Sequence, residues 1–142
     1  MNQIENKNLS NIFLEKLNIY KKSAIKYLIT YSILFTVFIA GLIVFLYFKY
    51  ADNNWASSFY LNAVKIASAV LNAIGSIFAF VYLMIWLFLI LKFKKMELYV
   101  SYHKCAKEID LIKNNTYVSF IFPIIFVPII LINIKKINDK LK

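Results

Sequence analysis

Three long runs of apolar residues, separated by polar and basic segments, divide the chain. The first run, residues 27–48, contains 22 residues without a charged side chain, the second covers 66–91 and the third covers 118–134. An α-helix rises about 1.5 Å per residue, so about 20 apolar residues cross a hydrocarbon core of roughly 30 Å. The pattern predicts an all-α integral membrane protein with about three transmembrane helices in a single membrane domain, residues 1–142.

The third run is the least regular of the expected spans. It has only 17 residues and contains Pro123 and Pro128. Proline has no backbone N–H and cannot donate a helical hydrogen bond, so a helix through this run is expected to be kinked. We weigh two forms, a short Pro-kinked helix that crosses the membrane and a re-entrant or shallow segment that returns to its starting side. The re-entrant form requires its backbone groups to be buried in protein.

The segment before the first run, residues 1–26, is polar and basic but has one apolar side. At about 100° per residue, the apolar positions Leu9, Ile12, Phe13, Leu17, Tyr20 and Ala24 project together. The polar residues Asn11, Glu15, Asn18 and Lys22 project on the opposite side. The segment is therefore either an amphipathic helix in the membrane interface or a plain polar tail.

Two polar segments connect the runs. Residues 49–65 combine turn-forming Asp and Asn residues with aromatic residues, which is typical of a short loop at a membrane surface. Residues 92–117 contain nothing that breaks a helix before Asn114 and Asn115. We therefore expect one helix that continues the second span into water.

Lysines set the expected orientation, because cytoplasmic segments of membrane proteins hold an excess of positive charge. Residues 1–26 contain five lysines and residues 92–117 contain six, against two in residues 49–65. The N-terminus and the 92–117 segment are therefore expected in the cytoplasm, in a multi-pass protein of the cell membrane. Three full crossings would export the four lysines of the basic tail, residues 135–142, whereas a re-entrant third segment would keep them inside.

The formal net charge of +10 does not indicate nucleic-acid binding. All 17 basic residues are lysine, and the sequence contains no arginine, the preferred residue for bidentate phosphate contacts. The abundance of Ile, Asn, Lys, Phe and Tyr is typical of a protein from an AT-rich genome. We expect the lysines to face lipid headgroups, so the bilayer is an expected partner and nucleic acid is not.

Small and polar residues line one side of the second run and part of the first. Asn62, Lys65, Ser68, Ala69, Asn72, Ser76 and Ala79 project within an arc of about 120°. We define the polar stripe as Ser32, Thr36, Ala40 and Gly41 of the first run with Ser68, Asn72 and Ser76 of the second. Small residues let helices approach closely, and hydroxyl and amide groups bond between them. Helix packing is the expected role, and a water-filled path is the alternative.

Residues with catalytic or metal-binding chemistry gather only in the 92–117 segment, as His103, Cys105, Glu108 and Asp110. On a helix, His103 and Cys105 point about 200° apart, which denies them a shared metal ion or a nucleophile–base contact. The apolar runs contain no carboxylate, histidine or lysine for proton or ion coupling. We expect no enzymatic activity, no catalytic residue, no metal and no cofactor.

These features favour a small non-catalytic membrane protein that works by association. We expect an accessory or assembly subunit that packs against other membrane protein subunits or against itself. A homo-oligomeric pore, similar to a holin in permeabilising the membrane, is the alternative suggested by the small size, the few spans and the lysine-rich tail. A transporter component is a further alternative.

Overall fold

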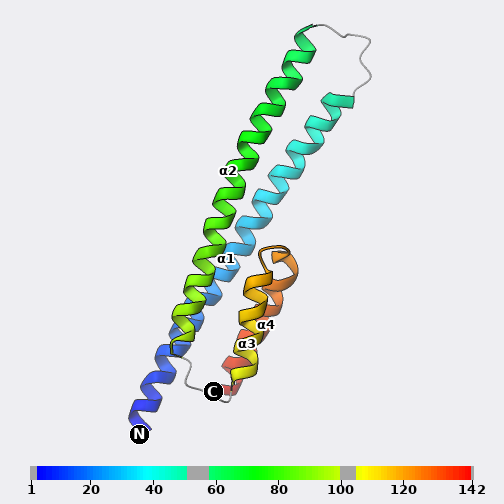
Figure 1. Ribbon diagram of the computed structural model, residues 1–142. Helices are drawn as coiled ribbons and strands as arrows, with labels where there is room; N and C mark the ends of the chain where they lie inside the picture. The colour runs from blue at the N-terminus through cyan, green and yellow to red at the C-terminus, as the bar shows by residue number, and fades with distance from the viewer. Residues whose placement is uncertain (1–2, 51–57, 100–104, 142) are drawn as a thin grey trace. The chain divides into compact units, whose positions relative to one another are not determined.

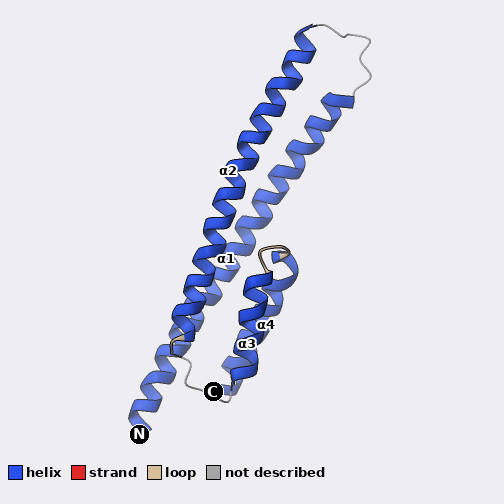
Figure 2. Ribbon diagram, viewed as in Figure 1, coloured by secondary structure: helices blue, strands red, loops and turns tan. Residues whose placement is uncertain are grey.

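The computed structural model describes residues 3–50, 58–99 and 105–141, and the regular secondary structure of these residues is entirely helical (Figures 1 and 2). The helices are α1 (Gln3–Tyr50), α2 (Ser58–Glu97), α3 (Ala106–Val118) and α4 (Pro123–Leu141). The all-helical prediction is confirmed for this part of the chain. Most of the 49–65 loop lies outside the described residues.

Two of the helices are long and apolar enough to cross a membrane. The qualifying stretches are Asn11–Tyr47 of α1 and Asn62–Glu97 of α2. They contain the second expected span and all but the last residue of the first. The third expected span, 118–134, differs from the expectation, because a turn interrupts it after Val118 and α4 ends in a basic segment. Within the described residues, two candidate spans therefore stand where three were expected.

The chain forms two compact units, and each contains one part of α1 and one part of α2. One unit, Tyr31–Tyr82, is an antiparallel helix pair, with the rings of Tyr31 and Tyr82 in contact at a centroid distance of 5.4 Å. A Cβ atom added to Gly41 would lie 2.9 Å from Cδ1 of Leu71, so the missing side chain permits a close approach of the helices. None of the described side chains in this unit is buried.

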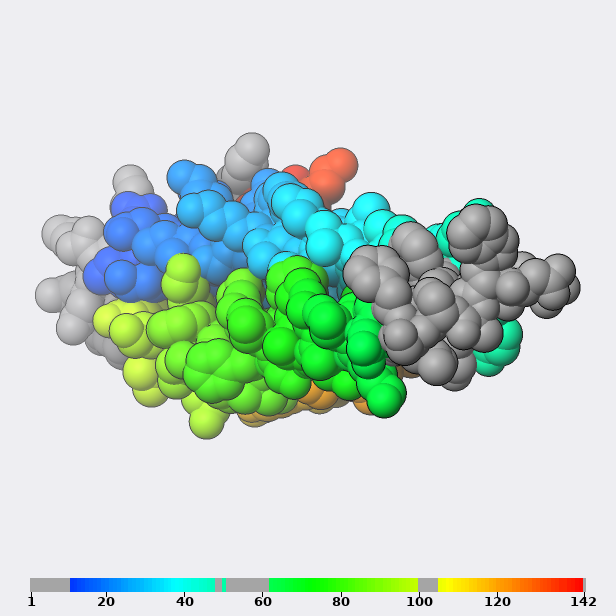
Figure 3. Space-filling view, turned by 90° about the horizontal axis from the view of Figure 1, so that it is seen from above, coloured from blue at the N-terminus to red at the C-terminus, as the bar shows by residue number. Residues whose placement is uncertain are grey.

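The other unit, Met1–Thr30 with Leu83–Lys142, is a bundle of four helical segments with a buried core. In the space-filling view, the α1 and α2 segments of this bundle lie side by side (Figure 3). Buried residues other than Glu108 and Asn133 follow one another at alternating spacings of four and three, which is the 3.5-residue repeat of coiled coils. They are Phe13, Leu17, Tyr20, Ala24 and Tyr27, then Leu89, Phe93 and Met96, then Cys105, Ile109, Ile112, Thr116 and Ser119, and finally Pro123, Val127, Ile130, Ile134 and Ile137.

The apolar side of residues 1–26 lies in this core, which neither expected form of the segment included. Phe13, Leu17 and Tyr20 are each at most 1% exposed. Ile12, which was assigned to the same side, is 39% exposed, and the side chain of Leu9 lies outside the described residues. The segment is an amphipathic helix, but its apolar side contacts protein.

The end of α2 at Glu97 shows that the expectation of one helix through residues 92–117 was wrong. A turn follows α2, with a backbone hydrogen bond of 3.2 Å from Leu98 N to Lys94 O. The chain reverses direction between α2 and α3, and the asparagine pair that was expected to end the helix lies inside α3. Reversal buries the apolar side of α3, including the fully buried Ile112, which a straight continuation into water would expose.

A helical hairpin formed by α3 and α4 completes the bundle (Figure 1). Its tip is the turn 119–122, which precedes Pro123. Pro123 occupies the first position of α4, where the absent N–H has no intrahelical acceptor to lose. Pro128 lies inside α4 and does not end it. The reversal therefore occurs before both prolines, at the start of the third apolar run.

Candidate functional site

The α2 half of the polar stripe lines an open groove in the Tyr31–Tyr82 unit. The groove has a volume of about 510 Å³. Its lining residues include Ser68, Asn72 and Ser76 from α2 and Phe38, Leu42 and Phe45 from α1. Asn72 is exposed, and no hydrogen bond among the described residues uses its side-chain amide. One wall of the groove is thus polar and the other is apolar.

The α1 half of the polar stripe lies differently. Gly41 faces Leu71, but Ser32, Thr36 and Ala40 are exposed and do not line the groove. The hydroxyl of Thr36 donates to the carbonyl oxygen of Ser32 in its own helix, at 2.8 Å. The role of the polar stripe in helix packing therefore stays a prediction, with its α2 half facing the groove.

A second group of polar residues, which the sequence analysis did not single out, is buried in the bundle at the end of α3. The last carbonyls of a helix have no partner in that helix and need other donors. Trp86 Nε1 donates to the carbonyl oxygen of Thr116 at 3.1 Å, and the hydroxyl of Ser119 donates to the same oxygen at 2.7 Å. The hydroxyl of Tyr27 donates to the carbonyl oxygen of Ser119 at 3.0 Å.

The remaining carbonyls at this helix end accept from backbone amides of the turn. Ser119 N donates to Asn115 O at 2.9 Å, and the amides of the next two residues donate to the carbonyls of Tyr117 and Val118. Every carbonyl from Asn115 to Ser119 therefore has a donor. Two of those donors, Tyr27 and Trp86, come from other helices, so they join α3 to both α1 and α2.

Tyr20 and Thr116 add a side-chain hydrogen bond to this group, with the hydroxyl oxygens 2.5 Å apart. The Thr116 hydroxyl also lies 2.6 Å from the carbonyl oxygen of Ile112, which can only accept. The threonine proton therefore goes to that carbonyl, and Tyr20 donates to Thr116. The ring of Tyr20 meets Phe93 edge-on at 5.6 Å, so its phenol also connects α1 with α2. We call Tyr20, Tyr27, Trp86, Thr116 and Ser119 the polar clamp.

Ion pairs hold the other end of the hairpin. Lys140 Nζ lies 2.6 Å from Glu108 Oε1 and joins α4 to α3, while Lys113 Nζ lies 2.9 Å from Glu97 Oε1 and joins α3 to the end of α2. The hydrogen bond from Lys140 lowers the pKa of the Glu108 carboxyl, although burial opposes this shift. The hydrogen bond to Glu97 raises the pKa of Lys113. The charged forms of Glu108 and Lys113 are therefore favoured.

The structure describes three of the four residues that were expected to form a group, His103, Cys105, Glu108 and Asp110. His103 lies outside the described residues. Cys105 is buried at the start of α3, Glu108 pairs with Lys140, and Asp110 is exposed. Among the described residues, no group of three His, Cys, Asp or Glu side chains is placed to hold a metal ion.

A repeat in the sequence could have predicted the bundle. Residues that become buried are spaced alternately by four and three in the 92–117 segment and in the third apolar run. Apart from Glu108, the buried positions from Cys105 to Ser119 advance by four, three, four and three residues, and apart from Asn133 those from Pro123 to Ile137 do the same. Thr116 and Ser119 occupy core positions in this repeat although both are polar. A polar residue at a core position needs a buried hydrogen-bond partner, which is the clue that leads to the polar clamp.

Comparison of the chain with known protein families, with curated proteins and with solved structures found no match. The chain's own residues therefore carry the functional argument.

Replacing Tyr27 with Phe tests the polar clamp. Tyr27→Phe keeps the buried ring but leaves the carbonyl oxygen of Ser119 without its donor, at an expected cost of about 1–3 kcal/mol in the free energy of unfolding. Tyr31→Phe is the matched control, since no hydrogen bond among the described residues uses the Tyr31 hydroxyl. Unfolding in mild detergent, followed by circular dichroism, measures both. Equal stability of the two variants would contradict the clamp.

Proposed function

We propose that this chain is a multi-pass protein of the cell membrane, with α1 and α2 crossing the bilayer and the bundle held at the cytoplasmic face. The support for insertion is the composition and exposure of the Tyr31–Tyr82 unit. Its two helix segments are apolar, and none of its described side chains is buried. Apolar surface of this extent is unfavourable in water and normal in lipid. The support for orientation is the distribution of lysines.

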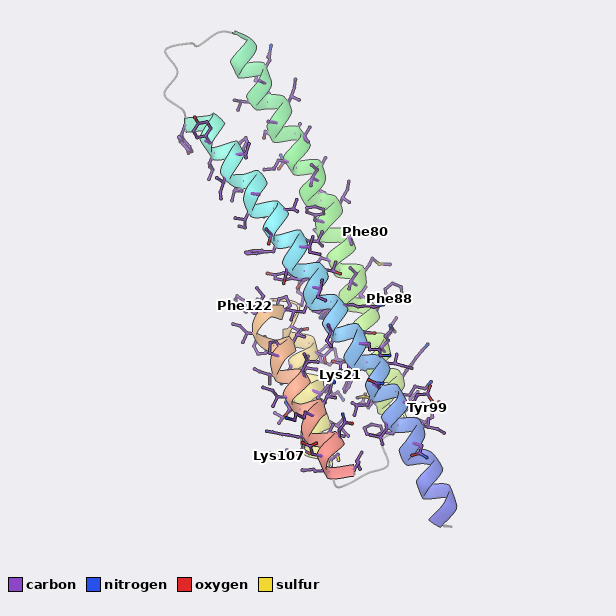
Figure 4. All side chains as sticks on the ribbon, turned by 180° about the vertical axis from the view of Figure 1, so that it is seen from behind. Lys21, Phe80, Phe88, Tyr99, Lys107 and Phe122 are labelled. Carbon is purple, nitrogen blue, oxygen red and sulfur yellow. The ribbon has the colours of Figure 1, made fainter. Side chains whose placement is uncertain are left out.

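In this proposal the hairpin of α3 and α4 does not cross the bilayer and reaches only its cytoplasmic interface. Its contacts with Tyr27 and Trp86 bring the turn 119–122 to the level at which the apolar run of α1 begins. Two apolar residues of this tip are exposed, Ile121 by 63% and Phe122, labelled in Figure 4, by 56%. Such a tip suits the interface between headgroups and acyl chains. The return of α4 then keeps its lysines in the cytoplasm.

Labelling of single cysteines in intact cells tests this topology. In a Cys105→Ser background, we expect an impermeant thiol reagent to label Asn53→Cys and to leave Asn11→Cys and Asn138→Cys unlabelled until the cells are opened. Labelling of Asn138→Cys together with Asn53→Cys would show a third crossing and refute the shallow hairpin. Labelling of Asn11→Cys alone would invert the orientation.

Association with a larger membrane protein, as an accessory or assembly subunit, is the activity we propose. The observation that carries this proposal is the open groove with Asn72. An amide facing lipid at membrane depth lacks a hydrogen-bond partner, and a neighbouring helix can supply one. Asn72 and Ser76 on the polar wall of the groove are exposed, so a further helix can pack against this wall. No catalytic step is part of this proposal.

A homo-oligomeric pore is the second candidate. The same observation favours it, because Asn72 and Ser76 are exposed on one helix and hydroxyl and amide groups can line a water path when several copies assemble. The two candidates differ in the partner, which is another protein for the subunit and further copies of this chain for the pore.

Adding apolar bulk to the groove tests association. Asn72→Leu combined with Ser76→Leu should weaken the complex isolated in mild detergent by about 0.6–2 kcal/mol, because interhelical hydrogen bonds in membranes are individually weak. Ala67→Leu is the control, since it adds apolar bulk at an exposed position that lies about 140° from Asn72 around the same helix.

Mass spectrometry of the complex identifies the partner. A complex of identical chains that releases dye from vesicles would favour the pore. An unchanged complex in the double variant would refute an interface at the groove.

A further inference from the structure

A groove between α1 and α2 in the bundle unit combines basic and apolar walls. Its volume is about 470 Å³. Its lining includes Ser23, Lys26 and Thr30 from α1 and Ile85, Phe88 and Lys92 from α2. Phe88 is 56% exposed, so the apolar wall is open to a ligand that approaches from outside (Figure 4).

The polar and apolar groups are sorted along the groove. Lys92 Nζ donates to the hydroxyl of Ser23 at 2.7 Å, which fixes the register of the two antiparallel helices. In this register Lys92 lies at one end beside Ser23, Lys26 lies about one helical turn further along, and Thr30 and Ile85 lie at the other end. Thr30, Ile85 and Phe88 belong to the uncharged runs 27–48 and 66–91, whereas Ser23, Lys26 and Lys92 lie outside them. A ligand that fits must therefore be charged at one end and apolar at the other.

The charges of the groove are available for an anion. Lys26 and Lys92 are exposed, and neither forms an ion pair with an acidic side chain among the described residues. The acidic residues Glu97 and Glu108 are engaged by other lysines. The Ser23 hydroxyl donates its proton to the carbonyl oxygen of Ile19 at 3.0 Å and accepts from Lys92, so its role is to position the Lys92 ammonium group. The remaining N–H groups of Lys92 and those of Lys26 can donate to phosphate oxygens.

We infer that this groove binds an anionic phospholipid of the cytoplasmic leaflet, with the phosphate between Lys26 and Lys92 and an acyl chain along Ile85 and Phe88. This inference rests on the proposed membrane insertion and orientation. Anionic lipids are concentrated in the cytoplasmic leaflet, and basic pockets between membrane helices on that side bind their headgroups. The apolar end of the groove selects a lipid over a free phosphate, which has no acyl chain to place there.

Native mass spectrometry of the full chain in mild detergent tests lipid binding, with dioleoyl phosphatidylglycerol as the anionic probe and dioleoyl phosphatidylcholine as the zwitterionic one. Lys26→Gln with Lys92→Gln should weaken phosphatidylglycerol binding on the order of thirtyfold, since each lysine near a membrane surface contributes roughly a fivefold factor. Lys107→Gln with Lys136→Gln removes the same charge from exposed positions outside the groove and should change binding less than about threefold.

Three results would overturn the inference. They are equal loss of binding in both double variants, equal affinity of the wild-type chain for the two lipids, and displacement of phosphatidylglycerol by an equal concentration of inorganic phosphate. If the double glutamine variant fails to fold, Lys26→Gln alone still decides, because no hydrogen bond or ion pair among the described residues depends on the Lys26 ammonium group. This single variant should weaken binding about fivefold.

Extraction of membranes with alkaline carbonate separates this inference from the proposal of insertion. A wild-type chain that leaves the membrane would refute insertion and the lipid site together. A chain that stays in the membrane but does not distinguish the two lipids would refute the lipid site alone.

Discussion

The carbonyl oxygens at the end of α3 impose the constraint on which the bundle depends. Thr116 and Ser119 are each at most 1% exposed, so water cannot replace a missing donor at their carbonyl oxygens, and each of these two groups left unpaired would cost about 1–3 kcal/mol. Tyr27 and Trp86 supply donors from two other helices. The position of α3 therefore fixes the position of α4, because the turn that follows is held by the same hydrogen bonds. The core residues pack around this arrangement, but their contacts are not directional and do not by themselves select it.

The two units of the chain bury their apolar residues in different ways. In the bundle, the 3.5-residue repeat places side chains from four helical segments in one core. In the Tyr31–Tyr82 unit, the described apolar side chains remain outside, and the helices meet through Gly41. The proposed functions follow this division. A unit that leaves its apolar and amide groups open is suited to lipid and to a partner helix, and a bundle with a buried core is suited to the membrane surface.

The sequence was sufficient to predict the helical class, the first two apolar helices and the amphipathic character of residues 1–26, since each depends on local periodicity. It was not sufficient for the reversal after Glu97, because the following residues favour helix and only the burial of residues such as Ile112 stops a straight continuation. The sequence also left the third apolar run open between a Pro-kinked span and a re-entrant or shallow segment, because its composition suits a span while its core positions pack against α3. Helical periodicity predicted that Ser68, Asn72 and Ser76 share one side of α2. It could not predict that Phe38 of α1 lies across the groove from them, because that depends on how the two helices are rotated about their axes.

The coupling between Tyr20 and Thr116 tests the polar clamp most directly, because it reports one hydrogen bond between α1 and α3 independently of the packing around it. A double-mutant cycle with Tyr20→Phe and Thr116→Val, measured by unfolding in mild detergent, provides this energy. The clamp predicts a coupling of about 0.5–1.5 kcal/mol. Additive effects of the two substitutions, with a coupling near zero, would show that α3 is not held against α1 in this way.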